Sequence, residues 1–276
     1  MAILAALFPS SAVSSEGSAH AQPWELRAQY WEDLKLDPVV RNDRDLPKEE
    51  VPRNEYFVGY TWQYDENMVA ASYAHHPVLI RRGEPGHNGY FHQLDIRYQA
   101  KYGATRLSVS AGIHGSSNMF KHGDFHGEAL VGGFAATHSL DEDLGIGLNG
   151  DYRFGHFQVY PTVRWTLPIS VAGVVVANLP VAVHWHGAGE HWRVGVERYG
   201  EKWAALDRER KTDSAFYLNE WRFSARWTSP AFKNSMAIEL GAGISFDTEV
   251  HHLDLATGWV VDELDSAAFV LLGLKF

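Results

Sequence analysis

One short run in the first half of the chain has the residue types of a nucleophilic hydrolase site. His114-Gly115-Ser116 places an imidazole two positions from a hydroxyl, and Glu128 follows a dozen residues after the serine. A serine nucleophile needs a base to take its proton and a third group to orient that base. Ser116 and His114 have the first two of these residue types, and Glu128 has the third. If the run is a strand, however, His114 and Ser116 share a face with Ser108, Ser110 and Gly112, which is a polar face.

Histidine offers a second kind of chemistry, since the chain holds fifteen. His184 and His186 are two apart on one expected strand, and His191 follows across a tight turn. Three imidazoles near one turn could hold zinc or copper. The simpler interpretation is a set of solvated polar groups at a turn, and we expect no cofactor.

Charged and polar residues form the third and largest set, because they recur at alternate positions of the expected strands. We expect them to line an interior as a network of ion pairs rather than to act as acid and base catalysts. The residues are Asp95, Arg97, Lys101, Asn149, Asp151, Arg153, Arg164, Arg193, Glu197, Arg222, Arg226, Glu239 and Asp247.

The elements that position these residues have a period of two from Tyr56 to the end of the chain. Leu94, Ile96 and Tyr98 alternate with Asp95 and Arg97, for example. The last strand alternates in the same way and ends on an aromatic residue, with Val270, Leu272, Leu274 and Phe276 on one face. Strict alternation predicts strands with one apolar and one polar face. We count about twelve, with ten to fourteen possible, in an all-β antiparallel up-and-down barrel.

The terminal Phe276, the export-like N-terminus described below, and the crowding of Gly with paired charges on the polar faces favour a transmembrane β-barrel over a soluble β-protein, in which the apolar face would point inward. Mean hydropathy is −0.26, and aromatic residues make up 13% of the chain. No apolar run reaches the roughly 20 residues of a spanning helix. A barrel needs apolar residues only at alternate positions. One check is mixed: with twelve strands, the long stretches at 75–89 and 115–127 fall on the side where short turns are expected.

The N-terminal region differs from the rest. Residues 1–21 resemble an export signal, with an apolar core at Ala2 to Phe8 and a cleavage pattern at Ala19-His20-Ala21, although no Lys or Arg precedes the core. Residues 22–54 are expected to form a periplasmic segment or small plug. Within them Trp24, Leu26, Tyr30, Trp31 and Leu34 have the spacing of a short amphipathic helix. The barrel is then expected over 55–276.

Charge and cysteine content exclude other classes. The net charge of −10 argues against a nucleic-acid partner, which requires a clustered basic face. The absence of cysteine excludes a disulfide framework and thiolate metal sites.

The chain resembles an uncharacterised family of bacterial outer-membrane β-barrels whose members have no assigned activity. The resemblance implies a fold and a location but no mechanism. It is carried by 160–165 (YPTVRW), 177–180 (ANLP), His191-Trp192, 240–243 (LGAG), 262–269 (DELDSAAF) and 273–276 (GLKF).

A shorter resemblance is to the lipid A deacylases of the outer membrane. It rests on His114-x-Ser116 with Glu128 at the family's spacing, and on Asn118 nearby. It implies a triad of Ser116, His114 and Glu128 that faces lipid, and these three residues are therefore the catalytic candidates.

The expected function is therefore an outer-membrane barrel of a Gram-negative bacterium without clear catalytic machinery: a narrow or plugged channel, or a structural or binding barrel. The alternatives are a lipid A or phospholipid hydrolase and a soluble periplasmic β-protein. The expected partners are outer-membrane lipid and lipopolysaccharide, together with the barrel assembly machinery, which would recognise Phe276. The number of subunits is left open.

Overall fold

In a computed structural model of the protein, the structure describes residues 23–32, 34–36, 39–41, 44–46, 49–51, 53–77, 90–123, 125, 127–169, 172–187, 189, 191–207, 212–232, 236–254 and 258–276. The expected signal segment, 1–21, lies outside these residues. Among the described residues, no helix is long and apolar enough to cross a membrane.

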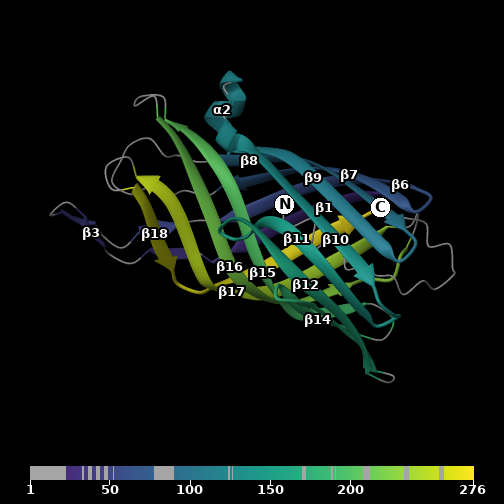
Figure 1. Ribbon diagram of the computed structural model, residues 1–276. Helices are drawn as coiled ribbons and strands as arrows, with labels where there is room; N and C mark the ends of the chain where they lie inside the picture. The colour runs from purple at the N-terminus through teal and green to yellow at the C-terminus, as the bar shows by residue number, and fades with distance from the viewer. Residues whose placement is uncertain are drawn as a thin grey trace.

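Fourteen antiparallel strands form one closed barrel (Figure 1), at the upper limit of the expected range. Each strand pairs with the next, and the last pairs back with the first through Leu26 and Leu274. In barrel order the strands are β1 (Trp24–Trp31), β6 (Asn54–Tyr64), β7 (Asn67–Pro77), β8 (Tyr90–Tyr102), β9 (Thr105–Ser116), β10 (Leu130–Ser139), β11 (Leu144–Phe154), β12 (His156–Ile169), β13 (Gly173–Leu179), β14 (Ala182–Gly187), β15 (Trp192–Asp207), β16 (Thr212–Thr228), β17 (Ala237–Asp254) and β19 (Ala267–Lys275).

Short elements lie outside this ring. β18 (Gly258–Leu264) pairs with the distal part of β17, and β2 (Leu34–Leu36) and β5 (Glu49–Val51) continue from it toward β6. β3 (Val39–Arg41) and β4 (Arg44–Leu46) form a separate hairpin. The helix α2 (Ser117–His122) and the 3-10 turn η1 (Gly127–Ala129) follow β9.

The barrel is apolar outside and charged inside, which is the reverse of a soluble domain. On β8, Leu94 and Ile96 are exposed while Asp95 and Arg97 are buried. The row between Tyr90 and Tyr102 spans about 40 Å along the strand, or about 25–30 Å along the axis of a tilted barrel, which matches a bilayer core. Other strands add exposed apolar side chains: Leu107, Val109, Ile146, Leu148, Val163, Phe223, Leu240, Ile244, Val270 and Leu272.

The expectation of a helical N-terminal segment is wrong, because Trp24–Trp31 is barrel strand β1. It pairs with β6 on one side and with β19 on the other, so the barrel begins at Trp24 rather than at residue 55. Its own alternation explains the result. Glu25, Arg27 and Gln29 point inward, while Leu26 and Tyr30 point outward. The helical spacing arose because several of the apolar residues fit the period of a strand as well as that of a helix.

A second additional strand lies between Val175 and Trp185, where the sequence alone predicts one strand with a bulge at Pro180. The structure makes it a hairpin, with β13 and β14 joined by a tight turn at Pro180 and Val181. The Val181 N–H donates to the Asn178 carbonyl across this turn. β1 and this split account for the difference between twelve and fourteen.

The added first strand also resolves the mixed pattern of connections. The six links that follow β6, β8, β10, β12, β14 and β16 are short or of moderate length and lie at one end, called here the turn end, together with Trp24 and Phe276. The long links 32–53, 78–89 and 117–129 all lie at the opposite, or loop, end. The backbone groups of Trp24 and Phe276 bond to each other and close the turn end of the β1–β19 pair.

The barrel narrows toward the loop end. β11 to β14 end early there, whereas β15 continues and forms a parallel bridge between Ala204 and the Gly115 backbone of β9. β10 to β14 therefore lie outside a smaller ring that the β9–β15 bridge closes through the other nine strands. β15 passes so close to β11 that a Cβ on Gly200 would lie 2.2 Å from the Tyr152 carbonyl oxygen. Only glycine permits this crossing.

Candidate functional site

The narrow end of the barrel is filled by an aromatic plug, defined as Phe57, Phe91, Tyr199, Trp203 and Phe216, all buried. The Phe91 ring lies 5.6 Å from that of Trp203 and 5.9 Å from that of Phe216. The smaller ring explains the plug, since a barrel of about eight strands leaves room only for side chains. No local pattern in the sequence predicts it, because it depends on β15 reaching β9.

A buried ionic network lies against this plug. Glu220, which is completely buried, accepts two hydrogen bonds from Arg53 at 2.8 and 3.0 Å and one from Arg222 Nε at 2.6 Å. The Arg222 guanidinium also stacks 3.2 Å from the centre of the Tyr199 ring. Arg27 pairs with Glu55 at 2.8 Å. These pairs neutralise charge inside the barrel and hold its walls together at the narrow end.

Below the plug, toward the turn end, the wider barrel encloses a cavity of about 970 Å³, called here the vestibule. Its lining runs from Phe57 and Tyr199 at the plug to Gln63, Lys101 and Lys275 at the turn end. The lumen is thus a recess rather than a passage of constant width.

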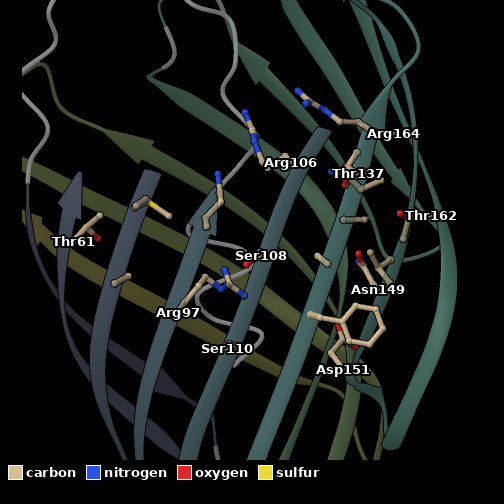
Figure 2. A pocket seen from close by; sticks show the side chains of 18 of the residues that line it. Thr61, Arg97, Arg106, Ser108, Ser110, Thr137, Asn149, Asp151, Thr162 and Arg164 are labelled. Atoms are coloured by element: carbon tan, nitrogen blue, oxygen red, sulfur yellow. The ribbon is translucent and has the colours of Figure 1, made fainter. Parts of the chain in front are cut away.

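One arc of the vestibule wall is basic. Arg97 of β8, Arg106 of β9 and Arg164 of β12 project into the same space from separate strands (Figure 2). Gly147 lies between Thr137 and Thr162 on the neighbouring strands, and the hydroxyls of these two threonines occupy the space beside it, since a Cβ there would lie 2.7 Å from Thr162 Oγ1 and 3.2 Å from Thr137 Oγ1. The arc carries hydroxyl and amide groups as well, from Ser108, Ser110, Thr137, Asn149 and Thr162, and a carboxylate from Asp151.

The carboxylates of the vestibule have cationic neighbours of their own. Asp151 lies 3.5 Å from Arg153 Nε and accepts from the Tyr160 hydroxyl at 2.8 Å. Glu197 lies 3.4 Å from Arg226 and 3.7 Å from Arg193. Arg106 takes part in none of the ion pairs found among the described residues of the vestibule. The chain is acidic overall, yet this wall is positive.

The residues expected to line the lumen are distributed between the plugged narrow end and the wider part of the barrel that contains the vestibule. Asp95 and Arg222 are buried near the plug. Arg226 pairs with Glu239 at 3.7 Å, and Glu239 also pairs with Lys275. The vestibule holds Arg97, Lys101, Asn149, Asp151, Arg153, Arg164, Arg193 and Glu197.

Asp247 is the exception among the expected lumen residues. A bulge between Asn219/Trp221 and Phe246/Glu249 inserts one extra residue into β17. Ser245 before the bulge and Thr248 after it are buried. Asp247 itself adopts a φ of 52°, and its side chain is 61% exposed and pairs with Arg198 at 3.2 Å. The extra residue changes the alternation and turns this carboxylate out of the lumen.

The geometry does not bring His114, Ser116 and Glu128 together as a triad. His114 is buried in the lumen, where Nε2 lies 3.0 Å from Asp95 and Nδ1 lies 3.0 Å from the Lys202 carbonyl. Both ring nitrogens are therefore engaged by partners other than a serine hydroxyl. Glu128 pairs instead with Lys202 at 2.6 Å.

The three candidate metal-binding histidines are also placed separately. His184 faces the vestibule, where Arg193 Nη2 lies 3.0 Å from its Nε2, and its ring centre is 6.4 Å from that of His186. His191 bonds through Nδ1 to the Thr228 carbonyl. Within the described part of the chain, no three His, Asp or Glu side chains form a group suited to a metal ion.

Sequence reasoning missed the inward residues Arg27, Arg53, Glu55 and Glu220. The first belongs to β1, where the alternation of Glu25, Arg27 and Gln29 was the available indication. For Glu55 and Glu220 the available indication was also the alternation, since Glu55 precedes outward Tyr56 and Glu220 lies two residues before Arg222. Arg53 lies just before β6, and no period in the sequence indicated its direction.

Comparison of the sequence with protein-family models and with curated protein sequences finds no match. Several solved barrel structures are similar at low identity. A bacterial polysaccharide outer membrane secretin is 11% identical with a TM-score of 0.36, covering 92% of this chain and 98% of that one. OpdL of Pseudomonas aeruginosa is 9% identical with a TM-score of 0.31, covering 91% and 98%. The CymD monoaromatic hydrocarbon channel is 7% identical with a TM-score of 0.30, covering 93% and 89%. The barrel assignment rests on the strand pairing within this chain.

Proposed function

We propose that the protein is an outer-membrane barrel that is plugged at the loop end and binds a small anionic solute in a vestibule open toward the turn end. The single observation that carries this proposal is the change from a 970 Å³ recess to a filled lumen along one barrel. A plugged channel or binding barrel, rather than an open pore, is the function that such an interior supports.

The outer apolar band and the charged lumen support the membrane placement over a soluble periplasmic protein. In outer-membrane barrels, short turns face the periplasm and long loops face outward. We therefore place the vestibule toward the periplasm and α2 at the cell surface. On this proposal, residues 1–21 direct export, Phe276 is recognised by the assembly machinery, and the outer face contacts lipid and lipopolysaccharide.

Wild-type protein reconstituted into planar bilayers should show no steady ion conductance, because the plug leaves no continuous water path. Single-channel recording at high salt measures this directly, and an unrelated open porin in the same bilayers controls for insertion. Regular conductance steps that scale with the amount of inserted protein would contradict the plugged lumen.

The basic arc should make anion binding depend on Arg106. Inorganic phosphate is expected to raise the unfolding temperature of detergent-solubilised protein, compared with sodium chloride at matched ionic strength. Arg106→Gln should weaken phosphate binding roughly tenfold, since a charge-assisted hydrogen bond contributes about 1.5–3 kcal/mol. Lys121→Gln, in exposed α2, removes the same charge elsewhere and should leave binding unchanged. Equal phosphate affinity in wild type and Arg106→Gln would exclude the arc as the anion site.

A further inference from the structure

A serine, a histidine and a tyrosine form a connected chain on the outer face of the barrel near the loop end. The Ser117 hydroxyl lies 2.7 Å from His92 Nε2, and His92 Nδ1 lies 2.7 Å from the Tyr73 hydroxyl. All three side chains are only partly buried. A nucleophile within reach of a base that is held by a third group is the arrangement of covalent hydrolytic catalysis.

The register of three strands creates this arrangement from residues far apart in sequence. His92 pairs across β8 and β9 with Gly115, so no side chain stands between the ring and Ser117, two residues further on. On the other side, β7 places His75 opposite His92 and Tyr73 opposite Leu94.

Aromatic rings hold the histidine in one orientation. The rings of Tyr73 and His75 are stacked or tilted against His92, with centres at 5.9 and 4.8 Å, and Phe120 of α2 lies at 5.3 Å. Met119 anchors α2 beneath, completely buried against Ala129 and Ala204. The Ser117 hydroxyl has a longer alternative acceptor, the Tyr90 carbonyl at 3.2 Å.

The position on the barrel indicates the class of substrate. His92 belongs to the outward row that continues with exposed Leu94 and Ile96, and exposed Tyr30, Tyr56 and Tyr90 surround this level. Tyrosine gathers where a bilayer meets water, at the level of the headgroups. The acyl esters of a membrane lipid lie at this same boundary.

We propose that Ser117, His92 and Tyr73 form a lipid-facing hydrolytic site for the acyl esters of outer-leaflet lipids. The substrate class rests on the proposed membrane placement, whereas the chemistry rests on the side-chain contacts alone. The Tyr73 oxygen accepts the proton on His92 Nδ1 and so fixes the tautomer whose Nε2 can act as a base.

The reaction is a two-step ester hydrolysis. Ser117 Oγ attacks the ester carbonyl while its proton passes to His92 Nε2, and the bond from carbonyl carbon to alcohol oxygen breaks as that oxygen takes the proton. Water, deprotonated by the same nitrogen, then adds to the acyl-serine. The proton returns to Ser117, a carboxylic acid leaves, and the net change is ester plus water to acid plus alcohol.

Wild-type protein refolded in detergent should react with a fluorophosphonate probe at Ser117, located by peptide mass spectrometry, and should release fatty acid from mixed micelles of phosphatidylcholine or of lipopolysaccharide. Ser117→Ala should abolish probe labelling, and Ser117→Ala and His92→Gln should each lower fatty acid release by at least about 100-fold. Tyr73→Phe should lower the rate less, by about 10-fold, and shift the pH profile.

Thr105→Val is the matched control, because Thr105 and His138 form an exposed hydroxyl–histidine contact of 2.9 Å at the other end of β9, and the described residues give this histidine no tyrosine partner. It should label and hydrolyse like wild type, and heat-modifiable migration checks that each variant has folded. The proposal is overturned if folded wild type neither labels nor hydrolyses, or if labelling survives in Ser117→Ala. Hydrolysis of a short p-nitrophenyl ester without lipid hydrolysis would keep the site but remove the lipid substrate class. Bilayer conductance is independent of these readouts, so this proposal and the plugged barrel can fail separately.

Discussion

Replacing Glu220 with alanine is expected to destabilise the folded barrel by about 3–5 kcal/mol. Its carboxylate is fully buried and accepts from Arg53, Arg222 and Thr248. Removal leaves two buried guanidinium groups without their shared counter-charge, and breaking one side of a buried ion pair typically costs this much. Arg53 and Arg222 also cover Trp31, at 4.1 and 4.9 Å, so the loss should loosen the packing of β1.

Urea unfolding in detergent micelles, followed by tryptophan fluorescence, measures this effect. Glu66→Gln is the control, because it removes an ion pair with Lys101 that is mostly exposed. Exposed pairs contribute less than about 1 kcal/mol, so this variant should unfold near the wild-type urea concentration. Similar losses for the two variants would mean that the lumen network is as hydrated as the surface and does not seal the barrel.

The alternation along each strand is enough to predict the barrel. It distinguishes the face of Asp95 and Arg97 from that of Leu94 and Ile96, but it cannot say which face points inward. Burial in the structure supplies that direction: the charged face is inside. The carboxyl-terminal strand has the same pattern, and its closing partner is β1, a strand whose apolar residues also fit a helix.

Features that depend on register or on long-range approach could not be predicted. A single extra residue near Asp247 reverses the alternation of β17, and no local pattern in the sequence indicates this bulge. The aromatic plug requires β15 to cross β11 at Gly200 and reach β9. The contact of His92 with Ser117 joins strand β8 to the first residue of helix α2 and follows no motif, whereas the more recognisable His114-x-Ser116 points into the lumen.

The second large effect concerns access to the two ends of the barrel. The chain contains no cysteine, so a single introduced thiol is the only reactive one. Ser108→Cys places it in the vestibule, and Lys121→Cys places it on exposed α2 at the loop end. If the lumen is plugged between these positions, a reagent added outside should reach α2 and be stopped before Ser108.

The decisive measurement is therefore the labelling of these two variants by a membrane-impermeant maleimide, first on intact cells and then after the outer membrane has been opened. A plugged lumen with the vestibule toward the periplasm predicts rapid labelling of Lys121→Cys in both states and labelling of Ser108→Cys only after opening, with at least a tenfold difference in rate on intact cells. Equal labelling of both variants on intact cells would contradict the plugged lumen, and labelling of Ser108→Cys alone would contradict the orientation.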